Sequence, residues 1–280
     1  MSEGQPLVSI VTPVYNGSRY LEDLIRSVLA QDYPNIEHVI IDDGSTDGGE
    51  TISILKRYPH LRWWSRPNKG QCRTVNEGFS AAQGSILTAI NADDMYAGPS
   101  AIGSAVRHLI SCPRHAGVFG YTIYMDETGK PLPVHPPRRL PWWALSSYLF
   151  VVQCSLLFRA DILKNGQMFP DPSLRYRWDR DWILRMVHAG FRFAYLDQPI
   201  GAFRYHASQV TQSTPRAALT AEDLLIDQRF SVSPVAKRVV HTYVDAHHRL
   251  HMAAWHLRVG GVRNLIREVA TWNERRRSRP

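Results

Sequence analysis

Cysteine is scarce in this sequence, and no hydrophobic run is long enough to cross a bilayer. The 280 residues include three cysteines, Cys72, Cys112 and Cys154, which are too few and too scattered for a disulfide framework or a zinc knot. The longest apolar stretch, residues 145–158, contains serine and glutamine and falls short of a membrane span. No basic segment leads into an apolar one at the start, so we expect no signal peptide. These absences predict a protein of a reducing, cytoplasmic compartment.

Acidic residues are the minority among the charged side chains. With 33 Lys and Arg against 25 Asp and Glu, the net charge is +8, which suits nucleic acid, anionic lipid or a phosphorylated small molecule. Six arginines crowd the last eighteen residues: Arg263, Arg267, Arg275, Arg276, Arg277 and Arg279. No recognised nucleic-acid motif accompanies them, so we expect no nucleic-acid partner. Two interpretations of this basic C-terminus stay open: a solvated tail, and a peripheral contact with anionic lipid at the inner face of the cell membrane.

Strand-like and helical segments alternate in the first half of the chain. Short apolar runs predict strands at residues 8–12, 36–41, 61–65 and 86–90. Apolar residues at helical spacing predict helices at residues 20–31, 49–57 and 74–82. Repeated βα units of this kind imply an α/β fold with a mostly parallel, Rossmann-like sheet flanked by helices.

The pattern changes after about residue 120. Short strands are expected at residues 121–125 and 132–134, and five prolines between residues 131 and 141 exclude long regular elements there. A helix is predicted at residues 179–189, with strands at 191–196 and 201–205. From residue 215 onward the pattern is helical, with breaks at residues 231–234 and 260–261.

Paired carboxylates follow the predicted strand at residues 86–90, in the segment Asn91-Ala92-Asp93-Asp94. Open α/β sheets bind their ligands beyond the carboxyl ends of the strands. Two adjacent carboxylates repel each other, and a divalent cation would offset that repulsion. The same residues also suit a solvated turn that caps the next helix. Taken alone, this segment leaves both interpretations open.

Five short motifs occur in a fixed order between Val8 and His206. They are Val8-Ser9-Ile10-Val11-Thr12-Pro13-Val14-Tyr15-Asn16, Asp42-Asp43-Gly44-Ser45-Thr46-Asp47, Asn68-Lys69-Gly70, Asn76-Glu77-Gly78 and Asn91-Ala92-Asp93-Asp94. Together they resemble family 2 glycosyltransferases of the GT-A fold. The resemblance implies a GT-A domain over residues 1–212, with a nucleotide-sugar-binding half (1–120) and an acceptor-binding half (121–212), followed by a helical extension (213–280). It also implies inverting transfer of a sugar from a nucleotide-diphosphate donor to a hydroxyl acceptor, in surface polysaccharide or glycolipid synthesis.

Donor contacts are implied at several strand ends. A carboxylate such as Asp42 can accept hydrogen bonds from a base N–H or from ribose hydroxyls. The resemblance implies a nucleotide role for Asp42, with Thr12, Pro13 and Tyr15 shaping the base pocket. The other donor-binding residues that it implies are Asp43, Asn68, Gly70, Asn91, Asp93 and Arg204.

In the family's Asp-x-Asp motif, the last carboxylate helps to bind Mg²⁺ or Mn²⁺ on the diphosphate, where the cation offsets the charge of the leaving group. The first position is Asn91 here, and either Asp93 or Asp94 could be the direct ligand. His206 matches a metal or phosphate ligand of some relatives, although a structural role suits it as well. Mg²⁺ and Mn²⁺ prefer oxygen ligands, and we expect no Cys/His cluster for zinc.

A sugar hydroxyl becomes a good nucleophile when a positioned carboxylate takes its proton. Residues 176–185 resemble the family's Glu-Asp segment, with Trp178 in place of the glutamate and Asp179 at the position of the base. Asp181 is the alternative base, and both aspartates also suit the N-terminal end of a helix. Acceptor contacts are expected from Trp142, Trp143 and Gln153, although paired tryptophans also suit a core.

Two other classes of protein fit part of this pattern. A nucleotidyltransferase would also pair a nucleotide site with metal-binding carboxylates, but residues 13–19 lack the Gly-rich, basic character of its phosphate loop. A non-catalytic, sugar-nucleotide-binding relative would keep the fold without turnover, and the changes at Asn91 and Trp178 leave that alternative open. Turnover of the donor in the presence of Mn²⁺ separates it from an active enzyme.

Overall fold

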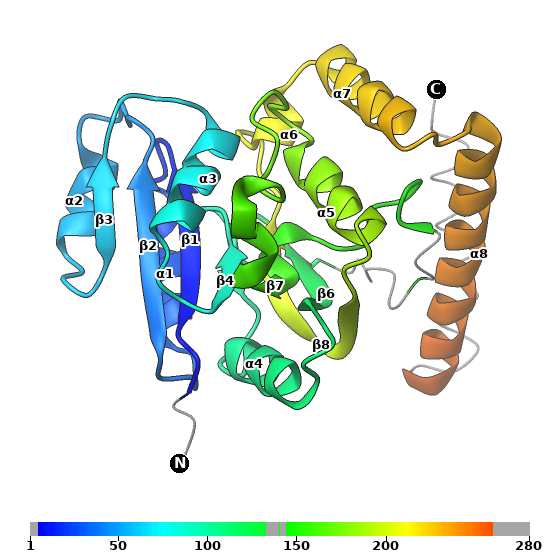
Figure 1. Cartoon of the computed structure of the whole chain (residues 1–280), viewed down its shortest axis with the longest axis horizontal. Helices are drawn as coiled ribbons and strands as arrows, with labels where there is room; N and C mark the ends of the chain where they lie inside the picture. Colours follow the sequence, from blue (N-terminus) through cyan, green and yellow to red (C-terminus); the bar gives the residue numbers. More distant parts are fainter. Residues whose placement is uncertain (1–4, 133–139, 141–143, 260–280) are drawn as a thin grey trace.

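The computed structural model describes residues 5–132, 140 and 144–259 (Figure 1). Its strands form one sheet in the order β3-β2-β1-β4-β7-β6-β8-β5. The strands are β1 (Val8–Val14), β2 (Ile36–Asp42), β3 (Arg62–Ser65), β4 (Ile86–Ala89), β5 (Met95–Tyr96), β6 (Gly117–Met125), β7 (Leu156–Arg159) and β8 (Phe193–Arg204). Strands β1 to β4 run parallel, as do β6 and β8, whereas β7 is antiparallel to β4 and β6 and β5 is antiparallel to β8. The predicted α/β fold with a mostly parallel sheet is confirmed.

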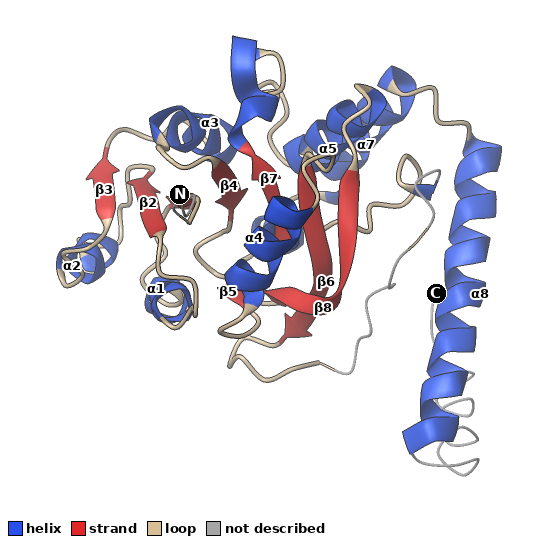
Figure 2. Ribbon diagram, turned by 60° about the horizontal axis from the view of Figure 1, so that its bottom comes forward, coloured by secondary structure: helices blue, strands red, loops and turns tan. Residues whose placement is uncertain are grey.

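Helices cover both faces of the sheet (Figure 2). One face carries α1 (Leu21–Leu29), α2 (Glu50–Lys56) and α4 (Ala101–Ser111), and the other carries α3 (Gln71–Ala81) and α5 (Trp178–His188). Alternate residues of a strand point to opposite faces. In β1, Ile10 therefore packs in a core cluster with α1 and α4, whereas Val11 packs with α3 and α5. Core on both faces explains why β1 is buried along its whole length.

The carboxyl ends of the parallel strands meet at one edge of the sheet. Val14 lies opposite Asp42, Asp42 lies opposite Ser65, and the last residue of β4 lies opposite Val11. The loops that follow β1, β2, β3 and β4 therefore share this edge. In open α/β sheets this is the edge where ligands bind.

The C-terminal part is helical, with α6 (Val210–Ser213), α7 (Arg216–Arg229) and α8 (Pro234–Val259). The break predicted at residues 231–234 is confirmed, and Ser231 adopts a left-handed φ of 52° there. Figure 1 shows α8 at the end of the molecule opposite β3, where Val240 and Val244 join the core cluster around α5. No helix in the described ranges combines the length and the apolarity that crossing a bilayer requires.

The second half of the sheet differs from the sequence prediction. One strand, β8, replaces the two strands expected at residues 191–196 and 201–205, because its pairing with β6 continues through register shifts next to Tyr121. β6 begins at Gly117 instead of residue 121, and the sequence patterns did not predict α4 or β7. Of the strand expected at residues 132–134, the structure describes only Leu132, whose N–H donates to Tyr124 O at 2.7 Å.

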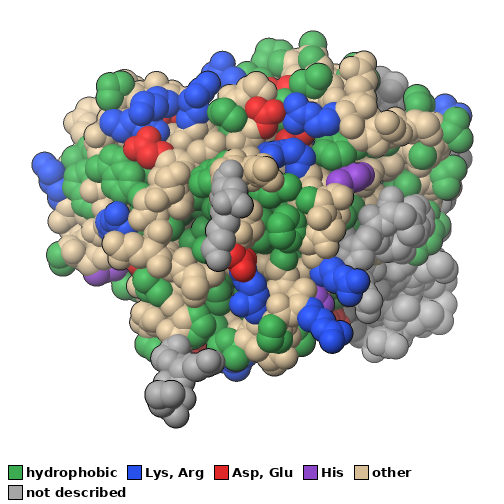
Figure 3. Space-filling model, viewed as in Figure 1, with side chains coloured by type: hydrophobic (Ala, Val, Ile, Leu, Met, Phe, Trp, Pro, Cys, Tyr) green, Lys and Arg blue, Asp and Glu red, His purple; other side chains and the backbone are tan. Residues whose placement is uncertain are grey.

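On the face shown in Figure 3, Lys and Arg side chains lie at separate places, with a few acidic side chains among them. The positive charge of the described residues on this face is therefore distributed and does not form a single basic stripe.

Candidate active site

The loops after β1 and β2 are joined by side-chain hydrogen bonds. Asn16 Oδ1 accepts a hydrogen bond from Thr46 N at 2.7 Å, and Asn16 N donates to Ser45 Oγ at 2.8 Å. Asn16 adopts a left-handed φ of 49°, which asparagine tolerates better than most residues. Beside it, Tyr15 is 50% exposed, so its ring can meet a ligand at this edge.

Thr12 and Pro13 lie beneath this surface, and both are buried. Thr12 Oγ1 lies 3.0 Å from His38 Nε2 inside the core. Burial lowers the pKa of His38 to about 3, so its ring is neutral. Of the three residues predicted to shape a base pocket, only Tyr15 presents its side chain at the surface.

Asp42 is buried at the end of β2 and is oriented by hydroxyl groups. Its Oδ1 accepts a hydrogen bond from Ser45 Oγ at 2.5 Å, and its Oδ2 accepts one from Ser65 Oγ at 2.5 Å. Ser45 N also donates to both oxygens at 3.3 Å, and Asp42 is 1% exposed. The serines hold the carboxylate at the ligand-binding edge of the sheet.

Asp43 ties the loop after β3 to the end of β2. Its oxygens accept hydrogen bonds from Lys69 N at 2.8 Å and Gly70 N at 2.9 Å, and from the guanidinium of Arg66. The carboxylate is thus engaged by the protein itself, whereas Asn68 in the same loop is exposed. In this arrangement Asp43 positions the Asn68-Lys69-Gly70 loop.

Two of the predicted metal ligands, 113 residues apart in the chain, lie side by side. Asp93 Oδ2 is 2.9 Å from His206 Nε2. The other ring nitrogen of His206 lies 2.9 Å from Ser208 Oγ, which fixes the orientation of the ring. The Asp93 side chain is 27% exposed, so it can be reached from solvent.

Asp94 points away from that pair, into the protein. It is buried, and its Oδ1 accepts a hydrogen bond from Arg204 N at 3.1 Å. Burial, and next the neighbouring carboxylate of Asp93, raise the pKa of Asp94 well above its ordinary value. Asp93, rather than Asp94, is therefore the carboxylate placed to bind a cation.

Arg204 is also buried, and its guanidinium is fully engaged by the protein. It donates to Asp93 O at 3.0 Å, to Glu127 O at 3.2 Å and to Asp23 Oδ2 at 2.9 Å. It also lies over the ring of Tyr20, 4.5 Å from the centroid. These contacts give Arg204 a role in positioning the Asp93 segment.

Gln71, the first residue of α3, connects the predicted metal and base segments. Its Nε2 donates to Asn91 Oδ1 at 2.8 Å, and its Oε1 accepts a hydrogen bond from Trp178 Nε1 at 3.2 Å. The end of β4 and the start of α5 are therefore brought to the same edge of the sheet. The sequence reading missed Gln71, whose only signal is its place directly after the Asn68-Lys69-Gly70 motif.

Asp179 lies in the first turn of α5 and is half-buried. Its Oδ1 accepts a hydrogen bond from Arg180 N at 2.8 Å. Burial raises the pKa of Asp179, while that hydrogen bond and the charge of Arg177 act in the opposite direction. A half-buried carboxylate with a raised pKa is a suitable general base.

Asp181, the alternative base, has a different environment. Its side chain is 0% exposed, and its oxygens form ion pairs with Arg185 Nε at 2.8 Å and Arg229 Nη1 at 2.5 Å. Both oxygens are held by arginines, which favours a structural role for Asp181 and leaves Asp179 as the better candidate.

Glu222 on α7, which the sequence reading also missed, holds the segment that leads into α5. Its carboxylate accepts hydrogen bonds from the backbone N–H groups of Arg175, Tyr176 and Arg177 at 2.8, 2.9 and 2.8 Å. These groups have no partner inside a helix that starts at Trp178. Nothing in the sequence around Glu222 identifies it as the partner of a segment 45 residues away.

Among the predicted acceptor residues, Trp142 and Trp143 lie outside the described residues. Gln153 lies in the short 3₁₀ helix η2 (Gln153–Ser155) and is 7% exposed. Its Nε2 has no hydrogen-bond partner among the described residues. A buried amide donor without a partner is costly, so this group has the capacity to bind one more acceptor.

The chain belongs to the glycosyltransferases of family 2. The sequence pattern of the family described as "Glycosyl transferase family 2" matches residues 9–165, more than half of the chain. A glycosyltransferase of Rickettsia bellii is 40% identical over 225 residues, which cover 75% of this chain and 31% of that protein. TuaG of Bacillus subtilis, named for teichuronic acid biosynthesis, is 28% identical over 78% of this chain and 86% of its own length. The chain thus spans about a third of the Rickettsia bellii protein.

Solved structures establish the fold as GT-A. Residues 1–349 of TarS from S. aureus, in complex with UDP-GlcNAc, superpose with a TM-score of 0.67 at 17% identity, over 90% of this chain and 73% of that one. The mannosyltransferase PcManGT of Pyrobaculum calidifontis, in complex with GDP-Man and Mn²⁺, gives a TM-score of 0.60 at 16% identity, over 96% and 81% of the two chains. At these identities the similarity is one of fold.

Proposed function

We propose that this protein transfers a sugar from a nucleotide-diphosphate donor to a hydroxyl group of a carbohydrate or glycolipid acceptor, with inversion at the anomeric carbon. The hydrogen-bonded chain from Asn91 through Gln71 to Trp178 carries the proposal, because it supports one site for donor and base. In this site Asp42 recognises the nucleotide and Tyr15 packs on its base. Asp93 faces the diphosphate, and Asp179 faces the acceptor.

A divalent cation fits the pair formed by Asp93 and His206. Their facing atoms are 2.9 Å apart. Neighbouring ligands of an octahedral ion with bonds of about 2.1 Å are separated by about 3 Å, so both atoms can bind one ion. Since imidazole is an unusual ligand for Mg²⁺, Mn²⁺ is the better fit. When bound, the cation supplies charge neutralisation for the leaving diphosphate.

In the proposed transfer step, Asp179 accepts the proton that the acceptor hydroxyl loses. Its carboxylate takes the proton of the acceptor hydroxyl while the acceptor oxygen bonds to the anomeric carbon. The bond from that carbon to the diphosphate breaks, and the electron pair leaves with the diphosphate. Attack from the face opposite the leaving group inverts the configuration of the anomeric carbon.

Surface polysaccharide synthesis is the proposed setting. The name of the Bacillus subtilis relative supports it, and the nucleotide sugars in the TarS and PcManGT complexes support a nucleotide-sugar donor.

A thermal-shift screen of UDP-, GDP- and dTDP-sugars, with and without Mn²⁺, tests the donor site. A ligand that binds the folded state alone raises the melting temperature, and we expect one nucleotide class to do so in a Mn²⁺-dependent way. No shift with any donor contradicts the proposal.

Turnover is tested with the donor that the screen selects. We expect Mn²⁺-stimulated release of the nucleoside diphosphate and, with a suitable acceptor, a product whose anomeric configuration by NMR is opposite to that of the donor. Donor binding without any release of nucleoside diphosphate would identify a non-catalytic relative.

A further inference from the structure

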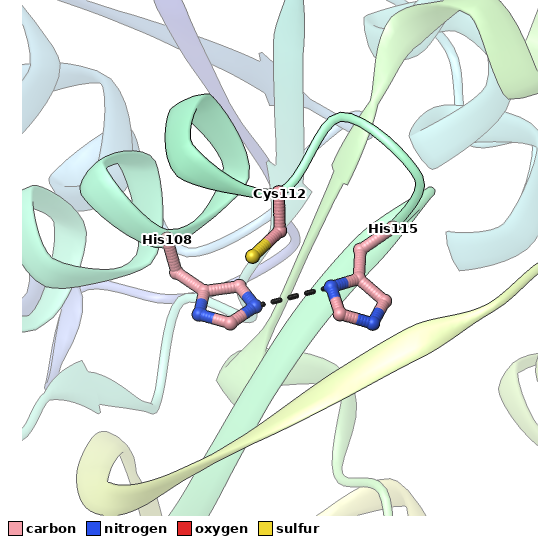
Figure 4. A group of neighbouring side chains, drawn as sticks. All are labelled: His108, Cys112 and His115. Atoms are coloured by element: carbon pink, nitrogen blue, oxygen red, sulfur yellow. Dashed lines mark hydrogen bonds between the residues drawn. The ribbon is translucent and has the colours of Figure 1, made fainter.

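A group of side chains that could hold a metal ion lies at the C-terminal end of α4. His108 and Cys112 are one helical turn apart, and His115 follows in the turn that leads to β6 (Figure 4). One ligand atom from each, a ring nitrogen or the thiol sulfur, lies within 4.8 Å of the others. The expectation that the chain offers no Cys/His cluster is therefore wrong, because the turn after α4 brings His115 back to the helix.

This group is far from the candidate active site. His115 is two residues before β6, whose first residue pairs with Phe193 at the start of β8. His206 follows the opposite end of β8, whose twelve residues end at Arg204. A strand of that length spans about 35–40 Å, so the two groups cannot share one ion.

The geometry is close to that of a zinc site. His108 Nε2 lies 3.2 Å from His115 Nδ1, and the two rings are stacked with centroids 5.3 Å apart. In tetrahedral zinc sites, two ligand nitrogens are about 3.4 Å apart and nitrogen and sulfur about 3.6 Å apart. The nitrogens already have the required separation, and rotation about the Cα–Cβ bond of Cys112 can bring the sulfur closer.

The turn that carries the ligands is held in place by its neighbours. Arg159 Nε donates to His115 O at 3.0 Å, and the same guanidinium donates to Leu109 O. The backbone N–H of Cys112 donates to His108 O at 3.0 Å, and that of His115 donates to Cys112 O at 3.0 Å. Although Arg159 is positively charged, the last carbonyls of α4 carry the negative end of the helix dipole, which favours a cation.

Metal binding requires a lone pair on one nitrogen of each ring and a deprotonated thiol. To bind a metal, His108 keeps its proton on Nδ1 and His115 keeps its proton on Nε2, while the Cys112 thiol loses one. Binding therefore releases one proton and is weakened by acid.

We propose that His108, Cys112 and His115 bind one Zn²⁺ ion, which fastens the end of α4 to the start of β6. Two imidazoles and a thiolate select zinc over Mg²⁺ and Mn²⁺, which prefer oxygen. A cavity of about 550 Å³ adjoins His108 and His115 and leaves the fourth coordination position accessible to water or a small anion. Arg192 also lines this cavity.

The test uses the full chain without a polyhistidine tag, stripped of metal by a chelator and then titrated with Zn²⁺ against a competing chromophoric chelator. We expect one tightly bound equivalent, and Cys112→Ser and His115→Ala each weaken binding by at least about tenfold. Two control variants should retain the tightly bound Zn²⁺. They are His60→Ala, which changes an exposed histidine elsewhere, and Asp93→Asn in the proposed donor site. Unchanged affinity in Cys112→Ser and His115→Ala, or loss of the tight equivalent in Asp93→Asn, overturns the proposal.

A second measurement needs no substitution. Cys112 is half-buried, whereas Cys72 and Cys154 are buried, so iodoacetamide should modify Cys112 first in the native protein. We expect Zn²⁺ to slow modification of Cys112, and Co²⁺ to produce the near-ultraviolet band of a thiolate–cobalt bond. A rate that Zn²⁺ does not change, or a Co²⁺ complex without that band, overturns the proposal.

Discussion

Asp179 and Asp181 are two residues apart on the same helix, yet their surroundings give them different properties. Both oxygens of Asp181 form ion pairs with arginines. Asp179 is half-buried, its Oδ1 accepts a hydrogen bond from Arg180 N, and burial raises its pKa. The first arrangement favours a fixed structural charge, and the second favours a group that exchanges protons.

Asp179→Asn tests the base directly. Asparagine keeps the acceptor for Arg180 N but cannot take a proton, so we expect sugar transfer to fall by about 10²–10⁴-fold. Because burial disfavours the charged carboxylate, the melting temperature of the variant at neutral pH should equal or exceed that of the parent. Full activity in this variant contradicts the assignment.

The pH dependence of transfer follows from the same burial. Asp179 acts as a base only when it is deprotonated, and its pKa is raised, so activity should fall with decreasing pH while an ordinary aspartate would still be charged. The acid limb of kcat/KM should disappear in the residual activity of Asp179→Asn. If kcat/KM of the variant still falls at low pH, a group other than Asp179 causes that fall.

Asp93 and Asp94 are adjacent in the chain, but we expect their asparagine variants to behave differently. Asp93→Asn removes the exposed carboxylate beside His206, so we expect Mn²⁺-dependent nucleotide binding to weaken by at least about tenfold. Asp94→Asn keeps an acceptor for Arg204 N and should change metal dependence much less. Isothermal titration of the nucleoside diphosphate with and without Mn²⁺ distinguishes them, and the reverse order of effects would make Asp94 the ligand.

At the scale of elements, α7 and α5 form a unit around the base. Besides the Glu222 hydrogen bonds, Arg180 on α5 pairs with Asp223 at 3.0 Å and with Asp227 at 2.6 Å, and Arg229 on α7 pairs with Asp181. Buried ion pairs are strongly destabilising to break, because the remaining charge is left without a partner. The helix that carries the proposed base is therefore held by a helix from the C-terminal segment of the chain.

Glu222→Ala tests that contact. It removes the acceptor of three backbone N–H groups at the start of α5, and we expect a loss of about 2 kcal/mol in the free energy of unfolding. Since α5 carries Asp179, kcat should fall while nucleotide binding stays. Gln228→Ala, at an exposed position of the same helix, is the matched control. Equal denaturation midpoints for the two variants would show that the Glu222 contacts contribute nothing.

The spacing of apolar residues predicted the helices that bury one side and the strands that end in a sequence motif. α1 buries Leu21, Leu24, Ile25 and Val28 at helical spacing, and its prediction is confirmed. α4 was missed although six of its eleven residues are buried at helical spacing and its outer side carries the exposed Arg107 and Ser111. The strand β7 lies inside a longer apolar stretch, and its antiparallel pairing between β4 and β6 is a tertiary feature that no local pattern encodes.

At the scale of the whole molecule, the motifs predicted which segments lie at the carboxyl edge of the parallel strands, but not which of their side chains are engaged by other parts of the protein. Asp93 and His206 meet although 113 residues separate them, and the family resemblance named both, together with Asp94, as possible metal ligands. Thr12, Asp43 and Arg204 were predicted to contact the donor, yet their side chains are engaged by His38, by the Asn68 loop and by the Asp93 segment. Gln71 and Glu222 were missed because contacts across long sequence separations leave no trace in spacing.

The basic C-terminus lies outside the described residues, and one of its two interpretations, a contact with anionic membranes, is testable. A chain truncated after Gly260 should lose more than about tenfold in affinity for anionic vesicles in a flotation assay, since each basic residue contributes about 1 kcal/mol. Replacing the six arginines by lysine should preserve binding, and replacing them by glutamine should not. Unchanged flotation of the truncated chain excludes the tail as the membrane contact.

A crystal structure with Mn²⁺ and the donor that the thermal-shift screen selects tests the central claim most directly, with the cation located by its anomalous scattering. We predict manganese bound to Asp93 and His206, the diphosphate on the cation, and the Asp179 carboxylate facing the anomeric carbon from the side opposite the diphosphate. A cation that touches neither Asp93 nor His206, or a sugar that points away from Asp179, would contradict the account.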